Sequence, residues 1–97
     1  MIQILDEQIY ELSSFYKIFG DPTRLKILIE LVESEKTVST LVENLGMSQS
    51  VISHQLKVLR DHRIVKNERK DKYVIYSLDD NHVLSTLTQG IEHIMHG

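Results

Sequence analysis

The 97-residue sequence contains no cysteine, no tryptophan, one proline and four glycines. Without cysteine it has no disulfide framework, no thiolate metal site and no cysteine nucleophile. No apolar run reaches the roughly 18 residues of a transmembrane helix. The N-terminus lacks the basic start and the apolar stretch of a secretory signal. These absences predict a cytoplasmic protein with no membrane partner. The low content of proline and glycine indicates regular secondary structure rather than disorder.

Charge is distributed unevenly along the chain, although the net charge is only −3. Residues 57–72 hold seven basic and three acidic side chains, whereas residues 1–45 hold four basic and eight acidic ones. Residues 73–97 hold three acidic side chains and no lysine or arginine. A polyanionic partner would therefore meet the middle of the chain. Taken alone, this pattern is equally typical of a solvated charged surface.

The chain is short enough to form one domain, residues 1–97. Apolar residues recur at helical spacing in five segments: 5–19, 22–33, 38–45, 49–61 and 80–96. Gly46 separates a short helix from a longer one, which is a helix-turn-helix pattern. Two stretches rich in β-branched and aromatic residues, beginning at 64–65 and at 73–76, flank a polar tip and predict a β-hairpin. The order of elements predicts a mainly α fold with a β-hairpin wing, the winged helix-turn-helix.

In this fold the second helix of the motif enters the major groove of DNA by its N-terminal part. That segment offers short polar side chains to base edges and phosphates: Ser48, Gln49, Ser50, Ser53 and His54. Basic residues suited to phosphates follow on the helix and the hairpin: Lys57, Arg60, Arg69, Lys70 and Lys72. Since the basic stretch and the fold signal coincide, we expect double-stranded operator DNA as the partner. An exposed helix without a partner is the alternative.

Enzymatic activity is not expected. Ser53 and His54 suggest a nucleophile and a base, but adjacent helix residues point in different directions. No acid with a third role is evident either. The sequence therefore predicts no catalytic residues and no protein substrate.

Three of the five histidines lie in the last 16 residues and contribute to two candidate ligand pairs. His93 and His96 are three residues apart and share one helix face, while Asp80 and His82 lie together at the start of the same helix. Zinc accepts imidazole nitrogen and carboxylate oxygen, and a closed site takes four ligands. The spacing therefore predicts a zinc site. The alternative is structural, because such residues also cap helices and interact with the helix dipole.

One helix cannot bring both pairs to one ion. His82 and His93 are eleven residues apart, roughly 16 Å along a continuous helix, whereas a Zn–N bond is about 2 Å long. Two antiparallel copies can join the pairs, and two-fold symmetry then creates two equal sites. The helix also carries a wide apolar stripe that needs a partner. We therefore expect a homodimer.

Three segments carry a resemblance to a known family: 19–28 (FGDPTRLKIL), 48–59 (SQSVISHQLKVL) and 76–78 (YSL). Together they resemble the ArsR/SmtB family of bacterial metal-sensing repressors over nearly the whole chain. The spacing Asp80-x-His82, ten residues, His93-x-x-His96 is similar to the C-terminal-helix metal site of zinc- and cobalt-responsive members. The thiolate site of other members has no counterpart, because residues 37–41 (TVSTL) contain no cysteine.

The resemblance implies a homodimer, paired through its first and last helices, that binds a palindromic operator when metal-free. It implies release on binding zinc or cobalt, control of metal efflux genes, and a link from His93 toward the end of the recognition helix near Arg63. Two positions depart from the family pattern: Val51 is apolar where related members often have a polar residue, and Asp71 replaces a glycine common at the wing tip. Asp tolerates left-handed backbone geometry but adds negative charge near phosphates.

Two other functions stay open. One is a repressor of the same fold that responds to a signal other than metal. The other is a dimeric protein-interaction module without DNA activity, which a salt titration separates from a DNA binder because DNA affinity falls steeply as salt rises.

Overall fold

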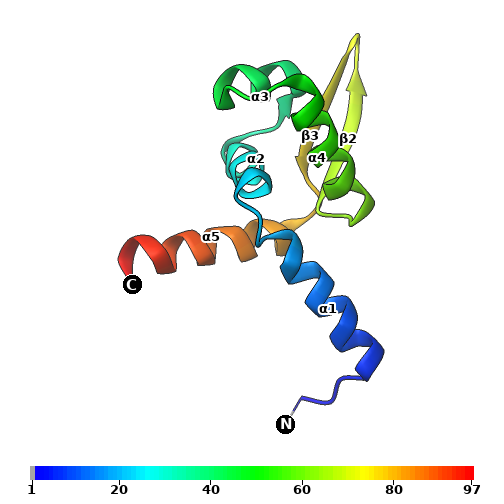
Figure 1. Ribbon diagram of the computed structural model, residues 1–97, viewed down its shortest axis with the longest axis vertical. Helices are drawn as coiled ribbons and strands as arrows, with labels where there is room; N and C mark the ends of the chain where they lie inside the picture. The colour runs from blue at the N-terminus through cyan, green and yellow to red at the C-terminus, as the bar shows by residue number, and fades with distance from the viewer. Residues whose placement is uncertain (1) are drawn as a thin grey trace.

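The computed structural model describes residues 2–97 and contains five helices and three strands in those residues (Figure 1). In chain order they are α1 (Asp6–Ile18), α2 (Pro22–Glu33), β1 (Lys36–Thr37), α3 (Val38–Leu45), α4 (Gln49–Asp61), β2 (Val65–Lys70), β3 (Tyr73–Leu78) and α5 (Asn81–His96). The winged helix-turn-helix prediction is confirmed, with α3 and α4 as the motif and β2–β3 as the wing. Across residues 2–97 no helix combines the length and apolar character needed to cross a membrane.

The helix ends follow from local side-chain chemistry. The carboxylate of Asp21 accepts a hydrogen bond from the Arg24 backbone N–H at 3.0 Å, which caps α2 ahead of Pro22. Gly46 ends α3 in the left-handed region at φ 66°. The Ser48 hydroxyl then accepts from the Val51 backbone N–H at 3.2 Å and begins α4. These caps fix the turn of the helix-turn-helix motif.

A core of aliphatic side chains holds α4 against α2 and α3. Six of them are fully buried, and they come from all three helices: Ile27, Leu28, Leu41, Ile52, Leu56 and Leu59. In α4 the buried positions are three or four residues apart, so one face packs inward and the other faces solvent. The core thereby fixes which side of α4 is free to meet a partner.

The sheet has the order β1-β3-β2, with both pairings antiparallel. The sequence did not predict β1, which is only two residues long and exists because Lys36 and Thr37 pair with Tyr76 and Ile75 of β3. The wing turns at Asp71, whose φ of 56° is the left-handed geometry that an aspartate tolerates. The wing extends away from the helices beside α4 (Figure 1).

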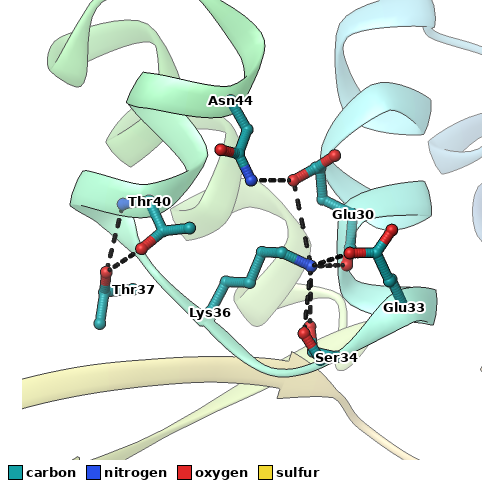
Figure 2. A network of polar contacts seen from close by, with 7 residues as sticks. All are labelled: Glu30, Glu33, Ser34, Lys36, Thr37, Thr40 and Asn44. Carbon is teal, nitrogen blue, oxygen red and sulfur yellow. Dashed lines mark hydrogen bonds and ion pairs between the residues drawn. The ribbon is translucent and has the colours of Figure 1, made fainter.

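Lys36 is the buried charged residue that ties α2 to the motif (Figure 2). Its Nζ donates to the backbone oxygen of Glu30 and, at 3.2 Å, to the hydroxyl of Ser34. The Glu33 carboxylate lies 3.6 Å away. Glu30 also accepts a hydrogen bond from the Asn44 side chain of α3 at 2.8 Å. The ammonium thus neutralises the carbonyl end of α2 while Glu30 holds α3 in place.

Replacing Lys36 with alanine will lower the free energy of unfolding by about 1–3 kcal/mol, the cost of leaving buried acceptors without a donor. Urea unfolding followed by circular dichroism measures this as a lower midpoint at unchanged slope. Lys26→Ala serves as the control, because Lys26 is an exposed lysine of α2 and its loss leaves no buried group unpaired. Equal midpoints for the two variants would contradict a stabilising role for Lys36.

Candidate DNA-binding surface and metal-ligating helix

All seven candidate DNA-binding residues of the motif lie on the exposed side of α4 or at its cap: Ser48, Gln49, Ser50, Ser53, His54, Lys57 and Arg60. This follows from the core, which takes the opposite face of the helix. Polar and basic side chains therefore form one continuous surface on α4. Lys57 already pairs with Asp61 at 3.1 Å, an exposed contact one turn along the helix. A phosphate at Lys57 would compete with that carboxylate.

The wing presents its basic residues on two faces. Arg69 pairs across the hairpin with Val74 and Lys70 with Tyr73, and because strand side chains alternate, Arg69 and Lys70 project to opposite sides. Lys70 Nζ donates to Glu35 Oε1 at 3.1 Å. That hydrogen bond and the charge of Glu35 raise the pKa of Lys70 above its usual value. The three basic residues predicted to contact DNA from the wing are all exposed: Arg69, Lys70 and Lys72. The carboxylate of Glu35 partly offsets the charge of Lys70.

Arg24 connects the end of α1 to α4, a role that the sequence did not reveal. Its Nε donates to the backbone oxygen of Ile18 at 2.9 Å and its Nη2 to that of Lys17 at 3.4 Å. Its Nη1 lies 3.5 Å from Oε1 of Gln55 on α4. The guanidinium thus stabilises the C-terminal carbonyls of α1 beside the DNA-facing helix. The sequence shows Arg24 within the segment FGDPTRLKIL, but it does not predict the contact of Arg24 with Gln55, 31 positions further along the chain.

Asp80 and His82 lie together at the start of α5. Asp80 Oδ1 accepts from the backbone N–H groups of His82 and Val83 at 2.9 and 3.1 Å, which caps the helix. Asp80 Oδ2 lies 3.4 Å from His82 Nδ1. The Val83 hydrogen bond, followed by the contact with His82, holds the pKa of the Asp80 carboxyl below its usual range. The cap and the ligand interpretations are therefore compatible, since each uses a different carboxylate oxygen.

His93 and His96 lie in the last turn of the same unbroken helix. Both are exposed, and with Gln89, Glu92 and Gly97 they line a shallow hollow at its carboxyl end. Within residues 2–97 no three histidine or acidic side chains come together as a metal site. The structure thus keeps the pairs at opposite ends of α5, and each offers nitrogen or oxygen donors that zinc accepts. The donor chemistry fits zinc or cobalt, provided that a second chain supplies the other pair.

An apolar groove of about 490 Å³ runs between the end of α1, α2 and α5. Leu87 is buried at its base, whereas the α5 residues Ile94 and Met95 are 81% and 71% exposed. Along α1 only Ile18 is buried, so this helix projects from the body with apolar side chains in solvent (Figure 1). Apolar surface of this extent marks an interaction site in a soluble protein. On α5 its lining runs from Thr86 to Met95, and two of the lining residues, Ile94 and Met95, lie between the candidate ligands His93 and His96 in the sequence.

Comparison with known proteins gives matches over nearly the whole chain. The family model described as "Bacterial regulatory protein, arsR family" matches residues 21–67. A Synechocystis sp. protein named "Transcriptional repressor SmtB homolog" is 35% identical over 88 residues, which covers 91% of this chain and 67% of that protein. The "HTH-type transcriptional regulator NmtR" of Mycobacterium tuberculosis is 38% identical over 86 residues, which covers 89% and 72%. The solution structure of apo-NmtR matches at 34% identity with a TM-score of 0.85 and covers 100% of this chain and 82% of that one.

Proposed function

Because the chain belongs to the ArsR/SmtB family of metal-sensing transcriptional repressors, we propose that it binds operator DNA as a homodimer when metal-free and is released by zinc or cobalt. As a member of this family of regulators it is not an enzyme. The genes that it controls in this proposal are those of metal efflux, and one domain, residues 1–97, binds both DNA and metal. The observation that supports the proposal is the placement of two exposed donor pairs at opposite ends of one unbroken α5 helix.

The dimer in this proposal forms through α1 and α5. The apolar groove beside α5 would be covered by the second chain, which removes exposed Ile94 and Met95 from water. An antiparallel pairing of the two α5 helices brings Asp80 and His82 of one chain to His93 and His96 of the other. The resulting four donors, three imidazoles and a carboxylate, form a closed set for zinc or cobalt. Two-fold symmetry makes two such sites per dimer and places two α4 helices for a palindromic operator.

Release follows from thermodynamic linkage. Metal bound between the subunits stabilises one relative placement of the two chains, and DNA requires a particular separation of the two α4 helices. If the two placements differ, metal weakens DNA binding and DNA weakens metal binding by the same factor. Couplings of this kind are about 1–3 kcal/mol, or roughly 5–150-fold in affinity. The link from His93 toward Arg63, at the end of α4, is the proposed route between the two sites.

Operator affinity measured with and without one zinc ion per protomer tests the proposal. We expect tight binding by the metal-free protein, a steep loss of affinity with rising salt, and a fall of roughly 5–150-fold on adding zinc. Fluorescence anisotropy with a labelled palindromic duplex measures all three. An operator affinity that does not change on adding zinc would favour a repressor that responds to another signal. Absence of DNA binding would favour the dimeric protein-interaction module.

The two faces of the wing give a prediction about DNA contacts. Replacing Arg69 with methionine will weaken operator binding and lower the slope of log affinity against log salt by about one, as for a lost phosphate contact. Lys70→Met will cost less, because a phosphate at Lys70 must displace Glu35. Glu35→Gln will accordingly strengthen binding. Salt titrations of these variants and the wild type provide the measurement, and a larger loss for Lys70→Met than for Arg69→Met would contradict it.

A further inference from the structure

Arg24 and Gln55 make a contact between two helices that the proposed DNA and metal sites do not use. Gln55 lies on α4 beside its buried face and is half-buried, and its Oε1 lies 3.5 Å from Nη1 of Arg24. Arg24 is half-buried too and stands in the first turn of α2, where the Asp21 carboxylate accepts a hydrogen bond from its backbone N–H at 3.0 Å. The contact therefore joins the start of α2 to the helix that faces DNA.

The other nitrogens of the same guanidinium hold the end of α1. Nε donates to the backbone oxygen of Ile18 at 2.9 Å and Nη2 to that of Lys17 at 3.4 Å. Packing holds α1 only near this end, where Ile18 is buried and Phe15 contacts the core, and the rest of the helix projects away from the body (Figure 1). A guanidinium is planar and presents its donors in a fixed geometry. Arg24 thus links the end of α1 to α4 through one rigid group.

We propose that Arg24 is a positioning residue that, through Gln55, sets the separation of the two α4 helices and so the spacing of operator half-sites that the protein accepts. This inference rests on the proposed function, in which α1 takes part in the pairing of two chains and α4 enters DNA. In a two-fold dimer, a change in the angle between α1 and α4 occurs in both chains and so acts twice on that separation.

The geometry of DNA makes half-site spacing a strict requirement. One added base pair moves a half-site by roughly 3.4 Å along the axis and by roughly 35° around it. A dimer whose α4 helices are held at a fixed angle to α1 pays in strain or lost contacts to follow that change. A dimer with a loose joint follows it at little cost. Discrimination between spacings therefore depends on the joint at Arg24.

The probe is a palindromic duplex that the metal-free wild type selects from a pool of random sequences, together with the same duplex carrying one base pair more or one fewer at its centre. Spacing selectivity is the affinity for the selected duplex divided by that for the altered ones, measured by fluorescence anisotropy on the full-length protein. Gln55→Met removes the acceptor and leaves Arg24 on α1, whereas Gln55→Glu keeps an acceptor for the guanidinium. In Arg24→Lys, one ammonium replaces the fork that reaches both helices. Gln3→Met is the control, because Gln3 is exposed ahead of α1.

We expect Gln55→Met to lower spacing selectivity by about 2–10-fold, the contribution of one hydrogen bond. Arg24→Lys will lower it as well, and adding Gln55→Met to Arg24→Lys will lower it no further, because both changes break the same contact. Gln3→Met and Gln55→Glu will keep the wild-type ratio, even if the added charge of Gln55→Glu weakens binding to every duplex equally. A role in folding alone would lower the thermal midpoint and leave the ratio unchanged.

The remaining outcomes separate this inference from the proposed function. Wild-type selectivity in Gln55→Met or in Arg24→Lys overturns the positioning role and leaves the proposed repressor intact. An equal loss of affinity for all duplexes in Gln55→Met overturns it too, because Gln55 would then contact DNA directly. A wild type that binds all spacings alike has no joint to explain and contradicts it. A wild type that selects no duplex overturns the proposed function itself.

Discussion

Replacing His96 with alanine will abolish the response to zinc while leaving metal-free operator binding at its wild-type value. His96 is exposed at the end of α5, so its loss removes no packing from the core. It supplies one donor to each proposed site, and a site left incomplete loses the metal affinity on which regulation depends. The ratio of operator affinities without and with zinc will fall from roughly 5–150 to about one.

His62→Ala is the matched control for this experiment. His62 is an exposed histidine at the end of α4, where its ring nitrogen Nδ1 contacts the backbone oxygen of Val58 at 2.9 Å. It belongs to neither ligand pair, and the variant will keep the zinc response. A zinc response retained by His96→Ala would place the metal ligands elsewhere. Loss of operator binding by metal-free His96→Ala would assign His96 to the assembly of the dimer.

The helices and the wing were predictable because their signals are local. Asp21 and Pro22 begin α2, Gly46 ends α3, and Ser48 caps α4, each through a hydrogen bond or a backbone angle within one turn. The period of apolar residues then decides which face of each helix is buried. Helix ends and buried helix faces depend on residues that are close together in the sequence, so they can be predicted from the sequence alone.

What was missed depends on contacts between distant segments. The strand β1 exists only through its pairing with β3, and the burial of Lys36 follows from that pairing and from the end of α2. From the sequence, Lys70 is predicted to be free to bind a phosphate. In the structure it donates a hydrogen bond to Glu35, which lies 35 positions earlier in the chain.

The metal site and the mode of operator binding both stay predictions for the same reason. A complete set of metal ligands and a pair of α4 helices each require a second chain. One chain shows each donor pair exposed and separated from the other by the length of α5. Sequence spacing indicates this division but does not show which surfaces meet. The exposed apolar side chains of α1 and α5 supply the missing physical reason for association. The proposed dimer is therefore the step on which both proposed activities, operator binding and the response to metal, depend.

Replacing Ile94 with glutamate will convert the proposed dimer to a monomer and will lower operator affinity by about 10²–10⁴-fold, the gain that linking two binding modules provides. Ile94 is 81% exposed in the single chain, so the carboxylate does not disturb the fold of the protomer. In the dimer it would be buried without a partner, at a cost that association through an apolar surface does not offset. Analytical ultracentrifugation measures the assembly and fluorescence anisotropy the operator affinity.

Zinc binding gives an independent measurement on the same variant. A monomer offers only Asp80 with His82, or His93 with His96, so zinc affinity will fall together with dimerisation and will recover at high protein concentration. Tyr73→Glu is the control for assembly, since Tyr73 is also an exposed apolar side chain, at 55%, but lies on the wing. That variant will remain dimeric. Were Ile94→Glu to stay dimeric with full zinc affinity, the subunits would meet through another surface, and the pairing of donors across α5 would be wrong.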